Sequence, residues 1–551
     1  MKRKILFTTE YTNAKSGFGK IGRELLTRFA QIPDFDIAEA SAFATIEHDF
    51  SHAKWRVYPL TVGPNHPEFQ IFESHPNNNW GAWRMDRVLL EYQPDIVINW
   101  GDPWNYQFMD NSPFREFFHL CVCPTCDSTP QQVQWLQTLQ DCDSMFTYAD
   151  WCIPYMQKHG LNPLGALYPG VDTKIFKPKD KIVARNKVGL PEDILLIGTT
   201  MRNQPRKLFA ELFKAFGIFL KKYGHTEIGK KTYLYLHTSY PDAGWDLPGL
   251  LNEYGVTNRV YFSYICQYSR KPLALKFSET AAFSPYSNTK SAGIPNVGHG
   301  YSEEQLVDMY NMFDLYIQYA VCEGLGLGGL EASSCGVPVC AIDYSAMSDV
   351  VQKTGGIALK PASIPRDLMM KADRATPDNE ATADAFYKFL CLNKSYRQKK
   401  SEQARKGAVE NFDWDISAAK LSNHIRNIKL TGLQGKWNAP PRPIDQSFPD
   451  VPQNITNTQF VQWCCTFIAK QPELASKYTG IQWISWLNNG GFLEGGKFNK
   501  MTREEIYNMC RHLGQNKIFA ERARCGVDQL QMTDYIEFSN VLYDDLKGQN
   551  A

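Results

Sequence analysis

The chain has 551 residues, of which 43% are hydrophobic and 21% are charged, and its formal net charge at pH 7 is +1. Because a single core rarely grows beyond about 250–300 residues, this length predicts two or more domains. A net charge so close to zero excludes a global electrostatic attraction to nucleic acid or to anionic lipid, so any such contact must come from a local patch.

Strands and helices alternate along the first part of the chain, which is typical of an open parallel sheet. The expected strands are 4–9, 95–100 and 119–123, and a helix is expected at 22–30. A second series follows with strands at 194–200, 232–237, 260–264, 315–320 and 337–342. Two such series predict two doubly wound domains that face a cleft, with ligands at the carboxyl ends of the strands.

The strongest local pattern is the segment Glu323–Glu331, which reads EGLGLGGLE between an expected strand and a short helix. The free N–H groups that begin a helix can bind phosphate, and glycines let the backbone approach a ligand closely. The two carboxylates can take hydroxyl groups on both sides of a pyrophosphate. The segment therefore predicts a site for a nucleoside diphosphate that carries a sugar.

This segment resembles the E-x7-E signature of the retaining GT-B glycosyltransferases of family 4, also called group 1, and Leu306–Asn311 and Asp349–Val351 match the family's flanking elements. The resemblance implies that Glu323 is catalytic and binds sugar hydroxyls, while Glu331 binds the ribose of the donor. It also implies donor contacts from the backbone of Gly324, Leu325, Gly326 and Leu327. Gly328 stands where many members have proline, which predicts a looser loop.

A basic segment, Arg202–Lys207, follows the expected strand 194–200. A departing nucleoside diphosphate needs cations when no metal is present. In the family, an arginine and a lysine at this place bind the diphosphate, so the resemblance makes Arg202 and Lys207 catalytic. Arg206 either shares this role or faces solvent.

The N-terminal part carries two further matches. Gly17 and Gly19 stand where the family has a glycine-rich loop over the donor phosphates, and with Gly22 they also spell the dinucleotide fingerprint G-x-G-x-x-G. The residues between the first strand and Gly17 are too many for that fingerprint. Asp127, in the run Cys123–Pro130, resembles an element that places an acidic residue on the acceptor or sugar side, and the alternative is a turn or helix cap.

The resemblance covers residues 1 to about 430 and predicts the following domains. They are an acceptor-side Rossmann-like domain at 1–180, a nucleotide-sugar-binding Rossmann-like domain at 181–405, a closing helix at 406–432, a proline-rich linker at 433–455 and a helical accessory domain at 456–551. The fold class is thus α/β, GT-B, with a small helical C-terminal extension. An insertion at 264–300, with a Cys266-x-x-Ser269 pattern, is expected to be a metal-free loop.

The sequence predicts a retaining, metal-independent hexosyl- or pentosyltransferase that uses a UDP- or GDP-sugar as substrate and needs no cofactor. The acceptor hydroxyl belongs to a saccharide or to a hydroxymethylated base in DNA, and the basic run 394–406 can track phosphates in the second case. The alternatives are a nucleotide-sugar-binding protein without catalysis and a nicotinamide-dependent dehydrogenase or epimerase. No apolar stretch reaches the ~18 residues of a membrane span, and the 14 cysteines are scattered, so a cytoplasmic protein (host cytoplasm if virus-encoded) without integral membrane contact is expected.

Overall fold

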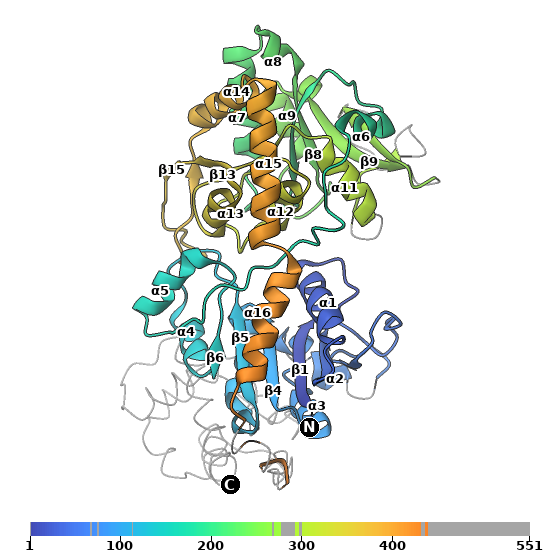
Figure 1. Cartoon of the computed structure of the whole chain (residues 1–551), viewed down its shortest axis with the longest axis vertical. Coiled ribbons are helices and arrows are strands. Elements are labelled where there is room, and N and C mark those ends of the chain that lie inside the picture. The colour runs from blue at the N-terminus through green and yellow to red at the C-terminus, as the bar shows by residue number, and fades with distance from the viewer. Residues whose placement is uncertain are drawn as a thin grey trace, which may run out of the picture. The chain divides into compact units, whose positions relative to one another are not determined.

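The computed structural model describes residues 2–66, 69–73, 76–112, 114–266, 269–276, 292–296, 300–430, 433 and 436–438. The chain forms two compact units (Figure 1). Of the described residues, unit 1 contains those within 2–124, 132–145 and 427–438, and unit 2 contains those within 125–131 and 146–426. The expected accessory domain at 456–551 lies outside the described residues.

Unit 1 is built on a six-stranded parallel sheet with the order β3-β2-β1-β4-β5-β6. Its strands are β1 Arg3–Glu10, β2 Phe35–Ala42, β3 Arg56–Pro59, β4 Ile96–Gly101, β5 His119–Pro124 and β6 Ser144–Met145, and its main helices are α1 Gly17–Phe29, α3 Met85–Tyr92 and α4 Val133–Gln140. Strand order reverses between β1 and β4, which makes their carboxyl ends the place where such a sheet binds ligands.

Unit 2 is built on the sheet β10-β9-β8-β7-β12-β13-β14, and β11 also pairs with β9. Its strands are β7 Leu195–Thr200, β8 Thr232–His237, β9 Val260–Cys266, β10 Pro272–Lys276, β11 Ala292–Gly293, β12 Leu315–Gln318, β13 Val339–Ile342 and β14 Ile357–Leu359. Here the order reverses between β7 and β12. The expected loop at 264–300 is corrected in part, because β10 and β11 pair antiparallel with β9.

The helices of unit 2 are α5 Ile153–Lys158, α6 Lys181–Val188, α7 Phe209–Tyr223, α8 Glu227–Lys231, α9 Leu247–Glu253, α11 Glu303–Asn311, α12 Leu327–Ser334, α13 Ala346–Thr354, α14 Asn379–Leu390, α15 Lys394–Asn411 and α16 Trp414–Asn427. α11 begins at Ser302, which forms a reciprocal capping box with Gln305. The expected closing helix is interrupted at Phe412–Asp413, where the backbone pairs with Val171. α12 and α13, which flank the candidate site, both pack against α15 (Figure 1).

Candidate active site

A cluster of charged side chains surrounds Glu323 at the reversal point of the unit 2 sheet. Glu323 follows β12 and is 4% exposed, while Lys207 follows β7 and is 7% exposed. Lys207 Nζ pairs with Glu323 Oε1, and Arg206 Nη1 lies 2.9 Å from Glu323 Oε2. The backbone of Lys207 bridges to Ala320, so the two loops are tied together by main chain as well as by charge.

The charges in this cluster determine its ionisation. Burial raises the pKa of Glu323, but Lys207 and Arg206 together outweigh burial and hold that pKa at about 2. Burial lowers the pKa of Lys207, and the neighbouring Arg206 lowers it further, against the attraction of Glu323. Glu323 is therefore a carboxylate at neutral pH and can accept hydrogen bonds from sugar hydroxyls.

The position of Glu323 is fixed by two residues that the sequence did not indicate. Gln318 Nε2 donates to Glu323 Oε1 at 2.6 Å. The backbone N–H of Glu323 donates to Ser345 Oγ at 2.9 Å, and Ser345 has a φ of +54°. A non-glycine residue in this left-handed region is strained, and such strain tends to gather at functional sites.

A line of hydrogen bonds leads from Glu323 to Glu331 on α12. Tyr316 OH donates to Gln318 Oε1 at 2.9 Å and lies 3.0 Å from Thr200 Oγ1, which in turn lies 2.8 Å from Tyr310 OH. Tyr310 OH donates to Glu331 Oε2 at 2.7 Å. We call Gln318, Tyr316, Thr200 and Tyr310 the connecting network, since they join the two glutamates of the E-x7-E segment within the interior of unit 2.

The connecting network explains why residue 328 is a glycine. It is the second residue of α12, and a Cβ at this position would overlap Thr200 Oγ1 and Tyr316 OH. The expectation that glycine loosens the loop is therefore wrong: the residue is helical, and its missing side chain leaves the room that the two hydroxyl groups occupy.

Gly324 and Gly326, which precede α12, are required for two different structural reasons. Gly326 has a φ of +89°, a conformation that favours glycine, and it caps α12. A Cβ on Gly324 would lie 2.8 Å from Thr125 Cγ2. Leu325 is buried and Leu327 begins the helix, so the backbone at 324–327 leads into a helix N-terminus next to Glu323.

The two expected cations are not equivalent in the structure. Lys207 lies in the Glu323 cluster, whereas Arg202 forms a two-pronged ion pair with Asp242 at 2.9 and 3.0 Å, and its side chain is 58% exposed. Arg206, the residue left open by the sequence, is the arginine that contacts Glu323. The Asp242 side chain is only 11% exposed and also accepts from Ser239 Oγ and Ala243 N, so this ion pair holds Arg202 away from the Glu323 cluster.

Asp127 lies next to this cluster within unit 2. Cys322 Sγ donates to Asp127 Oδ2 at 3.5 Å, and Ser128 Oγ donates to Asp127 Oδ1 at 2.8 Å. Cys322 precedes Glu323 in the chain, and Asp127 also contributes to the electrostatic environment of Arg206. The structure thus brings together Asp127, Lys207 and Glu323 from three separate segments.

Gly17 and Gly19 lie in the first turn of α1 and not in a loop, because Ser16 caps the helix by accepting from the backbone N–H of Gly19. A Cβ on Gly19 would crowd Tyr11 O, while one on Gly17 would meet nothing within 4 Å. Residues 11–16 separate β1 from α1, which differs from the tight strand-to-helix turn of dinucleotide-binding sites.

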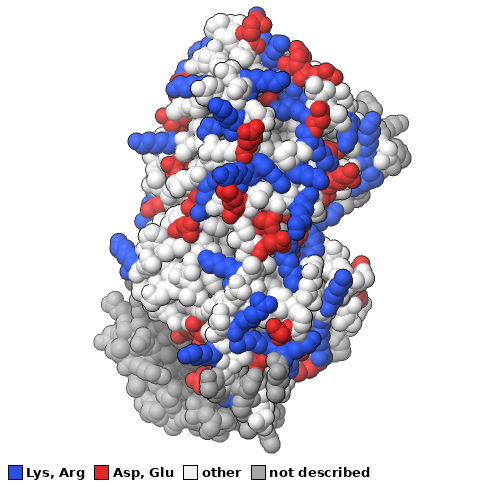
Figure 2. Space-filling view, viewed as in Figure 1, with Lys and Arg blue, Asp and Glu red and all other residues white. Residues whose placement is uncertain are grey.

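Two further expectations concern surfaces. Figure 2 shows acidic and basic side chains interspersed over the face that carries α15. On that helix, Arg405 Nη1 donates to Phe176 O and Ser334 O, and Lys400 Nζ donates to Gly355 O. These two residues of the basic run therefore stabilise their own unit.

Among the described residues, no group of His, Cys, Asp or Glu side chains is arranged to hold a metal ion, and none of their helices is long and apolar enough to cross a membrane.

Comparisons with known proteins concern the family and the fold. Residues 296–388, which contain both glutamates, match the family model described as glycosyl transferases group 1. Over 187 residues the chain is 27% identical to D-inositol 3-phosphate glycosyltransferase of Stackebrandtia nassauensis, a match that covers 33% of this chain and 34% of that protein. The chain thus spans about a third of the length of this curated relative.

Solved structures resemble a larger part of the chain. Sucrose-phosphate synthase from Thermosynechococcus elongatus superposes with a TM-score of 0.55 at 16% identity, covering 77% of this chain and 98% of that one. The HepE protein of Anabaena, solved with UDP-glucose, superposes with a TM-score of 0.52 at 15% identity, and the match covers 77% of this chain and 100% of that one. The fold is GT-B, with two Rossmann-like units, and the family match supports a glycosyltransferase.

Proposed function

We propose that this protein is a retaining glycosyltransferase that moves a sugar from a UDP- or GDP-sugar to a hydroxyl group, without a divalent metal. The observation that carries the proposal is the buried carboxylate of Glu323, held ionised by Lys207 and Arg206 at the reversal point of the unit 2 sheet. The carboxylate that can accept from sugar hydroxyls is there in direct contact with the two cations that can bind a diphosphate.

In the proposed reaction the bond between the sugar C1 and the β-phosphate oxygen breaks, and its electron pair leaves with the nucleoside diphosphate. The acceptor oxygen bonds to C1 on the same face, and its proton passes to the leaving phosphate oxygen. Lys207 and Arg206 stabilise the charge that develops on the diphosphate, and Arg202 joins them when it releases Asp242. Glu323 orients the sugar and Glu331 the ribose.

Donor turnover tests the proposal directly. The full chain is incubated with a panel of UDP- and GDP-sugars in EDTA and without acceptor, and nucleoside diphosphate release is measured. Slow release from one donor is expected, and it should vanish in Glu323→Ala with the fold intact. Absence of release and of any thermal shift with every donor would contradict the proposal.

The acceptor and the stereochemistry need a second experiment. With the identified donor, candidate saccharides and DNA that contains hydroxymethylcytosine are offered in turn, and the anomeric configuration of the product is read by NMR. Retention of the donor's configuration is expected, whereas an inverted product would contradict the assignment to the retaining class.

A further inference from the structure

Ser345, in the loop that follows β13, has a backbone conformation that serine rarely adopts. Its φ is +54° and its ψ is −156°. This combination borders the region at φ of about +60 to +180° and ψ of about ±150–180°, which is essentially restricted to glycine. A residue with a Cβ is strained there, and it keeps such a conformation only where the surrounding structure holds it.

The elements on both sides of Ser345 are fixed. Only Asp343–Ser345 join β13 to α13, and β13 pairs with β12 and β14 inside the sheet. On α13, Asp349 Oδ2 accepts from the backbone N–H of Asp150 at 2.6 Å and from Tyr168 OH at 2.9 Å. Because α13 also packs against α15, neither the strand nor the helix is free to move and relieve the strain.

The hydroxyl group of Ser345 does not serve its own helix. Ser345 is the N-cap residue of α13, a position at which serine ordinarily accepts from an N–H of the first turn. Among the described residues its side chain caps no N–H of that turn. Instead, Ser345 Oγ accepts from the backbone N–H of Glu323 at 2.9 Å. The strain and the missing cap both oppose stability, so the stability of α13 does not explain this arrangement.

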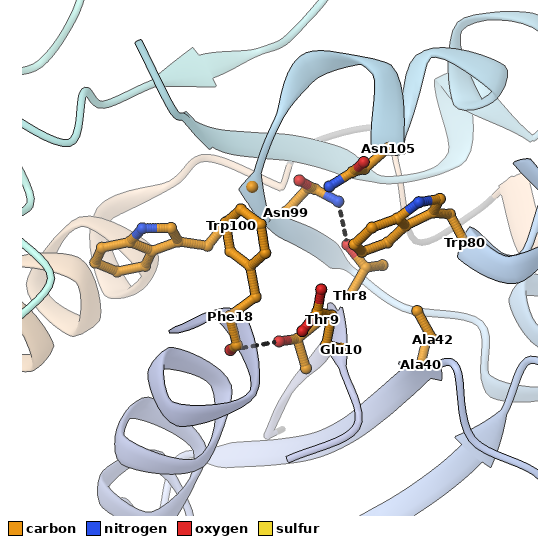
Figure 3. A pocket seen from close by; sticks show the side chains of 11 residues that line it. Thr8, Thr9, Glu10, Phe18, Ala40, Ala42, Trp80, Asn99, Trp100 and Asn105 are labelled. Atoms are coloured by element: carbon orange, nitrogen blue, oxygen red, sulfur yellow. Dashed lines mark hydrogen bonds between the residues drawn. The ribbon is translucent and has the colours of Figure 1, made fainter. Parts of the chain in front are cut away.

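Unit 1 contains a serine in a similar place without this strain. Ser16 precedes α1 with a φ of −111° and accepts from the backbone N–H of Gly19, while its hydroxyl group donates to the carboxylate of Glu10. Figure 3 shows Glu10 among the side chains at the carboxyl ends of β1 and β4. A serine can therefore cap a helix beside a glutamate in an ordinary conformation. What differs at Ser345 is that its hydroxyl group bonds to the main chain of the glutamate.

The peptide group between Cys322 and Glu323 is held at both ends. Its N–H donates to Ser345 Oγ, and its carbonyl oxygen accepts from Arg206 Nη1 at 3.2 Å. In the proposed function Arg206 also stabilises the diphosphate, so a bound donor competes for Arg206. Ser345 is only 2% exposed, so a donor does not compete for its bond to Glu323.

We propose that Ser345 is a positioning residue for sugar transfer. Its strained backbone aims the hydroxyl group at the Glu323 N–H and keeps the Glu323 main chain in place while the donor engages Arg206. The effect on turnover rests on the proposed function, whereas the restraint on the Glu323 main chain does not. Stability is lost at residue 345 in exchange for this restraint.

Two substitutions in the full chain separate the strain from the hydrogen bond. Ser345→Gly and Ser345→Ala both remove the hydroxyl group, but only alanine keeps the strained Cβ. Ser345→Gly should therefore unfold at a higher urea concentration than Ser345→Ala. Ser348→Ala, which removes a hydroxyl group from the first turn of α13, is the matched control.

Hydrogen-exchange mass spectrometry reads the restraint itself. A peptide that covers 320–326 should exchange at least about fivefold faster in both Ser345 variants, because the Glu323 N–H has lost its acceptor, while exchange in α12 should not change. Nucleoside diphosphate release from the donor should fall at least about fivefold in both variants. Their affinity for the nucleoside diphosphate alone, which carries no sugar for Glu323, should match that of wild type.

Three results would overturn the proposal. They are unchanged exchange at 320–326 in both variants, turnover that follows the urea midpoints instead of the loss of the hydroxyl group, and nucleoside diphosphate affinity that falls together with turnover. The proposed function fails separately. The expected exchange in a protein that turns over no donor refutes the transferase alone, and wild-type turnover with unchanged exchange in both variants refutes the positioning role alone.

Discussion

Gly328→Ala is the substitution that tests the connecting network most directly. A methyl group on Gly328 would overlap Thr200 Oγ1 and Tyr316 OH. Both residues belong to the central strands β7 and β12, whose backbones are held by neighbouring strands on both sides. Overpacking typically costs about 1–3 kcal/mol, and each hydrogen bond that is lost adds about 1 kcal/mol. We therefore expect the free energy of unfolding to fall by about 2–4 kcal/mol, and donor turnover to fall with it.

Urea unfolding followed by circular dichroism gives the stability, and nucleoside diphosphate release gives the activity. Gly329→Ala is the matched control, because it adds the same methyl group to the next residue of α12, where the nearest atoms are 3.6 Å away or more. That variant should be neutral or slightly stabilising, since alanine favours a helix over glycine by about 1 kcal/mol.

A double-mutant cycle locates the effect. In a Thr200→Ala, Tyr316→Phe background both blocking oxygens are absent, so Gly328→Ala should then cost less than about 1 kcal/mol. The reasoning is refuted if Gly328→Ala is as stable as Gly329→Ala, or if the methyl group costs the same in both backgrounds.

Three other changes have defined outcomes. Glu323→Gln leaves Lys207 buried without a full counter-charge, so the free energy of unfolding should drop by about 3 kcal/mol and turnover by at least about 100-fold; wild-type turnover in the folded variant would contradict the site. Asp242→Asn frees Arg202 from its ion pair, so nucleoside diphosphate should bind more tightly in calorimetry, and equal affinity would separate Arg202 from the diphosphate. Burial lowers the pKa of His237 from 6.5 to about 4. As the pH falls, the histidine is protonated in the unfolded chain before it is protonated in the folded one. The stability that neutral His237 contributes is therefore complete above pH 6.5, and about 3 kcal/mol of the free energy of unfolding should be lost as the pH falls to 4. Urea midpoints across this range should fall less steeply in His237→Asn, and identical slopes would refute the assignment.

The strands that form the centre of each sheet could be predicted closely from the sequence. β4, β5, β7 and β8 are buried and read as continuous apolar runs, as expected for parallel strands covered on both faces. β2 was missed because Glu39 interrupts its apolar pattern. That carboxylate is fully buried and accepts from Thr12 and Trp55, partners that only the folded chain supplies.

The candidate site could be predicted only in part. The resemblance of 202–207 and 323–331 to the family's motifs indicated Lys207 and Glu323, because a short motif keeps its chemistry in nearby residues. Gln318, Thr200 and Tyr316 could not be found this way, since their hydrogen bonds depend on how β7 and β12 pair. The ion pair of Arg202 likewise depends on Asp242, which lies in a different loop.

The connecting network has one proton fewer than its contacts require. Tyr310 donates to Glu331 and Tyr316 donates to Gln318, so the single proton of Thr200 serves only one of the two tyrosine oxygens beside it. If a ribose takes over Glu331, Tyr310 is released to donate to Thr200, and Thr200 must then donate to Tyr316. Binding at Glu331 would thus change which tyrosine oxygen receives the proton of Thr200, while the hydrogen bond from Tyr316 to Gln318 stays as it is.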